Sequence, residues 1–250
     1  IIDNNLAFPS QILCVTFTNK AAREMSERVQ KLVSQNMEKM PWMGTFHSIG
    51  AKIIRNHAEV IGLKQSFTIL DKDDQLSLIK QIIKAENLDQ SQFSPKLIQS
   101  KIDHWKNKAL NPNDIKSESL DNLVDEKSLS IYKIYQARLF EINCLDFGDL
   151  LLQCINLFKV PDIHKRYSNN FKYIHVDEYQ DTNAAQYKWL KLLGSHHQNV
   201  CCVGDDDQSI YSWRGAEVDN MLRFEKEFEN AKVIRLKQNY RSTNNILKSA

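Results

Sequence analysis

The chain has 250 residues, 42% of them hydrophobic, which is typical of a soluble globular protein with one large core or two modest ones. Its formal net charge is +2, from 33 basic and 31 acidic residues, and this balance gives no support for nucleic-acid binding by bulk positive charge. No segment approaches the roughly 20 uninterrupted apolar residues of a membrane-spanning helix, and no secretory signal opens the chain. The five cysteines form no Cys-x-x-Cys pair, which indicates buried free thiols in a reducing cytoplasm rather than a zinc site.

The first predicted element is a buried strand at 12–17, an apolar run rich in β-branched residues. Thr18 is placed to cap the helix that follows, where apolar residues recur at helical spacing. Beyond Pro41, residues 43–46 predict a second strand or turn that leads into another amphipathic helix. The chain therefore begins by alternating strands with helices.

From about residue 71 to 170 the pattern changes, because helix follows helix with little strand signal. Asp71 and Ser94-Pro95 mark two helix starts, since aspartate caps helices and proline favours the first helical position. A third helix is predicted at 125–142, and Asp146 is placed to cap a fourth at 147–158. We interpret this stretch as a helical insert.

Strand signals return in the last third of the chain, at 173–176, 199–203 and 232–236. Helices are predicted between these strands, the first ending at Gly194 and the second covering 218–228. Strands that alternate with helices predict parallel strands joined by crossover helices, so the sequence indicates an α/β sheet.

Polar clusters follow three of the predicted strands. They are Thr18-Asn19-Lys20, Asp177-Glu178-Tyr179-Gln180-Asp181 and Gly204-Asp205-Asp206-Asp207-Gln208. Open parallel sheets bind ligands at the carboxyl ends of their strands. The three clusters are therefore predicted to share one site.

The adjacent carboxylates Asp177 and Glu178 fit nucleotide chemistry. An aspartate at a strand end can hold Mg²⁺ on a nucleotide, and the glutamate can orient or deprotonate an attacking water. The alternative is a solvated acidic turn that caps the next helix, and the two carboxylates alone favour it. The further polar run 180–183 shifts the interpretation towards a nucleotide site.

Two aromatic rings and a cation lie within four residues at Tyr211, Trp213 and Arg214. Rings that stack on exposed bases contribute about 1–3 kcal/mol per base, and arginine adds a cation–π contribution. The alternative is that Trp213 is a core residue. This segment is the predicted contact for a single nucleic-acid strand.

The chain resembles the UvrD/Rep/PcrA group of superfamily 1 DNA helicases over essentially its whole length. Five strings of residues, in the family's order, carry the resemblance: Thr16 to Ala22, Gly44 to Ser48, Val176 to Asn183, Gly204 to Ala216 and Gln238 to Ser242. The helical stretch also matches, through Ile69-Leu70-Asp71 and Leu145 to Leu151.

The resemblance implies an α/β fold, a RecA-like parallel-sheet motor domain of the P-loop NTPase type with an inserted all-helical subdomain. The first motor domain (1A, incomplete) would combine residues 1–48 and 171–236. The helical insert (1B) would cover 49–170, and the second motor domain (2A) would start in 237–250.

The resemblance also implies ATP and Mg²⁺ as cofactors and assigns roles to single residues. Asp177 would hold Mg²⁺, Glu178 would activate the hydrolytic water, and Gln208 would couple the terminal phosphate to DNA. Arg241 would be an arginine finger on the transferred phosphoryl group. The residues that would contact single-stranded DNA are Thr16, Phe17, Asn19, His47, Tyr211, Trp213 and Arg214. Plainer alternatives are a hydrogen bond at a helix start for His47 and a surface arginine for Arg241.

One family motif is missing from the chain. None of the seven glycines is followed by lysine, so the glycine-rich phosphate loop (Walker A) is absent. The resemblance places that loop upstream of Ile1, and we expect the chain to be an internal fragment that hydrolyses ATP poorly alone. The chain also ends before most of the second motor domain.

The leading functional hypothesis is that the chain is part of an ATP-dependent 3′–5′ DNA helicase of the cytoplasm, which acts in repair or replication. It would translocate on single-stranded DNA, engage junctions of single- and double-stranded DNA, and meet DNA-repair proteins, without a membrane partner. A second hypothesis is a catalytically dead remnant with at most weak DNA binding. A third, ranked last, is the helicase part of a nuclease-helicase of the AddA/RecB kind.

Overall fold

A computed structural model gives the structure of the chain. It describes residues 1–33, 40–116, 120, 122–209, 224, 228, 231–236, 238–240 and 242–249. Within them, no helix is both long and apolar enough to cross a membrane. All five cysteines are free thiols; three are buried as expected, whereas Cys202 is half-buried and Cys201 is exposed on an edge strand.

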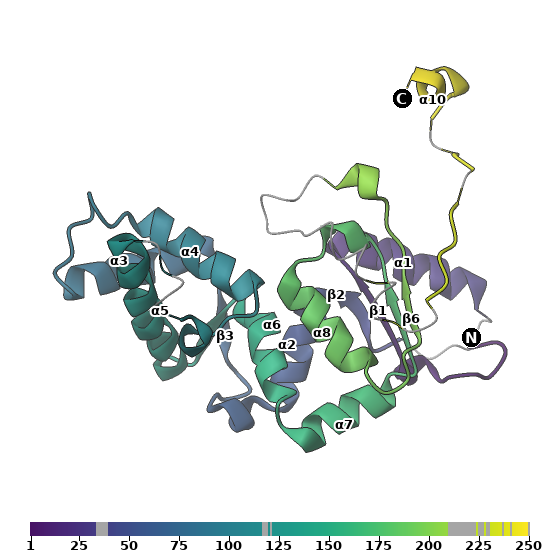
Figure 1. The fold of residues 1–250 in the computed structure, drawn as a ribbon. Helices are drawn as coiled ribbons and strands as arrows, with labels where there is room; N and C mark the ends of the chain where they lie inside the picture. The colour runs from purple at the N-terminus through teal and green to yellow at the C-terminus, as the bar shows by residue number, and fades with distance from the viewer. Residues whose placement is uncertain are drawn as a thin grey trace.

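The main sheet has four parallel strands in the order β2-β1-β5-β6 (Figure 1). The strands are β1 (Ile12–Thr16), β2 (Met43–Thr45), β5 (Tyr173–Val176) and β6 (Val200–Cys202). Strand β6 lies at one edge and pairs only with β5 among the described strands. The parallel arrangement confirms the α/β sheet predicted from the sequence, and it brings the carboxyl ends of all four strands to one edge.

Helices cover both faces of this sheet because successive side chains of a strand point to opposite faces. Leu13 and Val15 of β1 enter the large core, whereas Ile12 and Cys14 join a small cluster that includes Met25 of α1 (Asn19–Leu32). The large core is formed with four helices: α2 (Phe46–Asn56), α6 (Asp149–Leu157), α7 (Pro161–Asn170) and α8 (Ala184–Gly194).

A second core lies among the helices α3 (Lys72–Ala85), α4 (Pro95–Asn107) and α5 (Leu123–Glu141), which stand apart from the main sheet in Figure 1. The prediction that the insert contains only helices is corrected, because the insert also contains two short strands. Strands β3 (Thr68–Leu70) and β4 (Cys144–Asp146) form a separate two-stranded parallel sheet. Each has only three residues, too few for the period-two pattern by which a strand is recognised.

The bounds of the helical insert, residues 49 and 170, remain a prediction from the sequence. The packing adds that α2, α6 and α7, all inside that range, bury their apolar residues in the same core as the main sheet. The second core contains residues between Leu78 and Cys144.

The helix starts follow the sequence signals. Thr18 Oγ1 accepts from Ala21 N at 3.1 Å, and Asp71 Oδ1 accepts from Asp73 N and Asp74 N at 2.9 Å. Pro95 is the first residue of α4, as predicted. Short 3₁₀ helices lie between the longer elements: η1 (Pro9–Gln11), η2 (Ala58–Ile61), η3 (Pro112–Asp114), η5 (Tyr179–Asp181) and η6 (Asp206–Gln208).

The predicted strand at 232–236 is wrong. Residues 231–236 have no regular secondary structure, and Ile234 and Leu236 are 71% and 86% exposed. A strand needs a paired neighbour, and no described strand pairs with this segment. Most of the predicted helix at 218–228 lies outside the described residues, and a final helix, α10 (Asn244–Ser249), follows.

Candidate functional site

The turns after β5 and β6 are fixed to each other by backbone hydrogen bonds that continue the sheet. Asp177 N donates to Val15 O at 3.0 Å, and Val203 N donates to Val176 O at 2.8 Å. Tyr179 N then donates to Val203 O at 2.9 Å. The predicted clustering at one sheet edge is therefore present for the segments that begin at Asp177 and Gly204.

Glu178 has an unusual backbone conformation, with φ 54° and ψ 45° in the left-handed region. A non-glycine residue there is strained, and such strain persists only where surrounding contacts enforce it. Backbone hydrogen bonds hold the residues on both sides, from Asp177 N to Val15 O and from Tyr179 N to Val203 O. The side chain is held separately by Gln180, which is 1% exposed and donates from Nε2 to Glu178 Oε2 at 2.8 Å. The carboxylate of Glu178 is thus held in position while the residue remains exposed.

A chain of hydrogen bonds runs from Glu178 to Gln208. Gln180 Oε1 accepts from Asp205 N at 3.1 Å, and Asp205 Oδ2 accepts from Gln208 Nε2 at 2.5 Å. The two predicted catalytic side chains are therefore joined through Gln180 and Asp205. The sequence marked Gln180 only as part of a polar run and gave it no role of its own.

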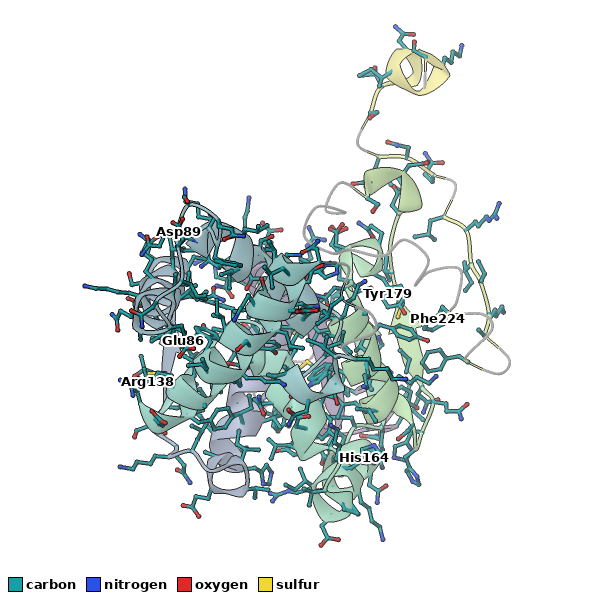
Figure 2. All side chains as sticks on the ribbon, turned by 60° about the vertical axis from the view of Figure 1, so that its left-hand side comes forward. Glu86, Asp89, Arg138, His164, Tyr179 and Phe224 are labelled. Atoms are coloured by element: carbon teal, nitrogen blue, oxygen red, sulfur yellow. The ribbon has the colours of Figure 1, made fainter. Side chains whose placement is uncertain are left out.

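Gly204 makes this close approach possible. A Cβ at this position would lie 2.8 Å from Gln180 Oε1 and 3.3 Å from the backbone nitrogens of Tyr179 and Gln180. Tyr179 also contacts Phe224 edge-on, with ring centroids 5.7 Å apart (Figure 2). The segment after β5 is thus fixed by contacts on several sides.

The carboxylates around Glu178 repel one another. Burial and the charge of Glu178 raise the pKa of Asp177, and the same two causes raise the pKa of Asp181. Arg28 of α1 acts in the opposite direction on the pKa of Asp177. Asp181 Oδ1 is buried and has no hydrogen-bond partner in the described part of the chain. A bound cation would relieve both the repulsion and the unpaired oxygen.

These residues fit Mg²⁺ that is shared with a nucleotide. Among the described residues, no group of three or more His, Cys, Asp or Glu side chains is arranged to hold a metal ion. Nucleotide-bound Mg²⁺ does not need such a group, because one or two carboxylates suffice when phosphate oxygens and water complete its shell. Asp177, half-buried at the end of β5, is the carboxylate best placed for this role.

Aromatic side chains lie at the carboxyl ends of β1, β2 and β4, and we call Phe17, His47 and Phe147 the aromatic edge. Phe17 contacts the buried Phe46 edge-on at 6.4 Å, and His47 contacts Phe147 at 5.9 Å between ring centroids. Phe147 is 49% exposed. Burial lowers the pKa of His47, so its ring is neutral near pH 7.

The remaining predicted DNA contacts divide into three groups. Asn19 is exposed in the first turn of α1. Thr16 is 0% exposed, because it belongs to a central strand, and no DNA strand can reach its side chain there. Tyr211, Trp213 and Arg214, together with the predicted arginine finger Arg241, lie outside the described residues. Phe147 was part of a matching string, but the sequence gave it no role.

A buried ionic network supports the turn that carries Phe147. Lys106 of α4, which is 1% exposed, lies 2.7 Å from Asp146 Oδ2 and 2.8 Å from Asp149 Oδ1. Asp149 N donates to Asp146 Oδ1 at 2.9 Å, and Asp146 N donates to Asp149 Oδ2 at 3.2 Å. Tyr135 Oη and Gln136 Nε2 add bonds to Asp146 and Asp149 at 2.9 and 3.0 Å. Every carboxylate oxygen of the network is therefore paired.

The network predicts a pH dependence of stability. Burial and the charge of Asp146 raise the pKa of Asp149 to about 6, above its ordinary value of 3.8. The folded chain therefore binds this proton more tightly than the unfolded chain, and the stability contributed by Asp149 falls as pH rises from about 4 to 6. We expect the free energy of unfolding of the chain, minus that of Asp149→Asn, to decrease over this range. Urea unfolding at pH 4, 5, 6 and 7 measures it; a difference that rises with pH would contradict the assignment.

Comparisons with known proteins give one family match and several similar relatives. A family profile described as "UvrD/REP helicase N-terminal domain" matches residues 1–229. The DNA helicase II of Rickettsia typhi is 51% identical over 254 residues, which covers 100% of this chain and 38% of the relative. The ATP-dependent DNA helicase PcrA of Staphylococcus aureus is 48% identical over 251 residues, covering 100% and 34%. The chain thus spans 34–38% of the length of these curated relatives.

Proposed function

Because the chain belongs to the UvrD/REP helicase family, we propose that it forms the first motor domain, with its insert, of an ATP-dependent DNA helicase. The helicase would move 3′ to 5′ along single-stranded DNA and separate duplex at single-strand/double-strand junctions, in repair or replication in the cytoplasm. The family match and the parallel sheet together confirm the RecA-like fold class on which this proposal is built.

The hydrogen-bonded chain from Glu178 to Gln208 carries the proposal. Asp177 would hold Mg²⁺, which neutralises phosphate charge when it is bound with ATP. Glu178, fixed by Gln180, would orient and deprotonate the attacking water. Gln208 would sense the terminal phosphate, and its link through Asp205 and Gln180 would tie that contact to the position of Glu178. Arg241 would supply the arginine finger.

The DNA side of the proposal rests on the aromatic edge. Phe17 and Phe147 would offer rings for stacking. His47 contacts Phe147 and directly follows Phe46, which Phe17 contacts. The exposed Asn19 would add a polar contact at the carboxyl end of β1. By the resemblance, Tyr211, Trp213 and Arg214 extend this surface. Stacking of this kind would let a nearly neutral chain bind a single strand without a large positive charge.

ATP hydrolysis by the full-length gene product, with and without single-stranded DNA, tests the proposal. Strong stimulation by DNA supports an ATP-driven motor. Absence of hydrolysis under both conditions would overturn it and favour a catalytically dead relative. An unwinding assay with a 3′ and a 5′ tail on the duplex determines the direction of movement.

Phe147→Ala should weaken binding of an oligothymidine strand by about 1–3 kcal/mol, because it removes an exposed ring that can stack on a base. Fluorescence anisotropy with a labelled strand measures the affinity. Phe8→Ala is the matched control, because Phe8 is 73% exposed but precedes β1, at the opposite end of the strand from Phe17. Equal losses in both variants would show that Phe147 has no specific role.

A further inference from the structure

The last turn of α4 contacts two segments that are far apart in the sequence. Lys106 binds both carboxylates of the turn that carries Phe147. The next residue, Asn107, accepts a hydrogen bond of 3.1 Å from Asn183 Nδ2, at the end of the acidic segment that follows β5. We call Lys106 and Asn107 the α4 end.

The contact between the α4 end and the turn that carries Phe147 is tight at Gly148. A Cβ on Gly148 would lie 2.8 Å from Lys106 Cδ and 2.9 Å from Lys106 Cβ. The helix itself is anchored in the second core by Ile98 and Ile102, both 0% exposed. A displacement of the turn would therefore push on α4, because close-packed groups transmit strain.

The segment on the other side of the α4 end is held by its own hydrogen bonds. Asn183 Oδ1 accepts from Gln186 N at 2.9 Å and so caps α8. Thr182 Oγ1 donates to Tyr179 O at 2.7 Å, and Asp181 N donates to Glu178 O at 3.0 Å. The segment from Glu178 to Asn183 is thus a single hydrogen-bonded unit whose far end contacts Asn107.

We propose that the α4 end transmits DNA contact at Phe147 to the segment that holds Glu178, with Asn107 as a positioning residue for DNA-stimulated ATP hydrolysis. This inference rests on the function proposed above. Asn107 touches neither nucleotide nor DNA in this scheme; it acts by setting the position of Asn183. A link through packed and hydrogen-bonded elements of this kind is a physical route for coupling two sites.

Three variants of the full-length gene product test the link. Asn107→Ala removes the acceptor, whereas Asn107→Asp keeps an oxygen that Asn183 can donate to. Asn183→Ser keeps a good helix cap, but the serine side chain is too short to reach Asn107. Asn156→Ala is the matched control, because Asn156 is also half-buried and its amide makes bonds of 2.8 and 3.2 Å with Asn111, away from both segments.

The main measurement is the ratio of the ATP hydrolysis rates with and without saturating single-stranded DNA. The affinity for the strand and the melting temperature are measured for each variant as well. Asn107→Ala should leave the basal rate and the strand affinity unchanged. Asn107→Ala and Asn183→Ser should each lower the ratio by about two- to thirtyfold. Asn107→Asp should restore most of it, and the double variant Asn107→Ala, Asn183→Ser should lose no more than either single variant.

Several results would overturn the inference. Losses that add in the double variant, an equal loss in Asn156→Ala, or a ratio that falls only in step with melting temperature would each assign Asn107 a structural role alone. If DNA stimulates the unmodified protein and Asn107→Ala to the same degree, the inference fails and the proposed function stands. If the unmodified protein shows no stimulation, the proposed function fails, and the inference fails with it.

Discussion

Replacing Lys106 by methionine should lower the free energy of unfolding of the chain by about 3–5 kcal/mol. Methionine fills a similar volume, so the cost comes from charge rather than from a cavity. The change leaves Asp146 and Asp149, 2% and 0% exposed, with no cation between them. Urea unfolding followed by circular dichroism measures the loss.

Two further variants separate this explanation from a general sensitivity of the fold. Arg138→Met removes a cation from an ion pair with Glu141 whose side chains are 58% and 61% exposed, and it should cost well under 1 kcal/mol. Adding Asp149→Asn to Lys106→Met should recover part of the stability, because one buried charge is removed. A loss below about 1 kcal/mol in Lys106→Met would mean that the buried pair is not held as described.

Glu178→Gln should lower ATP hydrolysis by the full-length gene product by about 10²- to 10⁴-fold, which is the usual contribution of a general base. The amide oxygen of glutamine can still accept from Gln180, so the local hydrogen bond and the backbone conformation are retained. Single-strand affinity should therefore stay unchanged. Steady-state hydrolysis with saturating DNA, together with anisotropy, measures both quantities.

Glu141→Gln makes the same chemical change at an exposed position on α5 and should leave hydrolysis unaltered. A Glu178→Gln variant that keeps more than a tenth of the parent rate would assign water activation to another group. In that case Asp181, whose pKa is raised by burial and by Glu178, is the next residue to examine.

Much of the fold could be predicted from the sequence because its signals are local. The strand 12–16, the caps Thr18 and Asp71, and the proline start of α4 each depend on a few neighbouring residues. The same holds for the acidic residues after β5, because a polar group directly after a buried strand is visible in the sequence. The three-residue strands β3 and β4 carry too short a pattern to be recognised.

The parts that could not be predicted depend on contacts between distant residues. Lys106 lies in a helix turn rich in polar residues and would be expected in solvent; its burial depends on carboxylates 40 and 43 positions later. Gln180 gains its role only when Gly204 brings the next turn against it. Phe147 becomes a candidate contact only when α2 places His47 beside it. No local pattern encodes these pairings.

The position of β6 has a consequence for the behaviour of the chain in concentrated solution. One long side of this strand carries backbone donors and acceptors that no described strand satisfies, and its side chains are half-buried or exposed. Open strand edges attract other chains, and a net charge of only +2 offers little colloidal repulsion against such contact. Solubility at high concentration therefore depends on how well this edge is kept from pairing with a second copy of the chain.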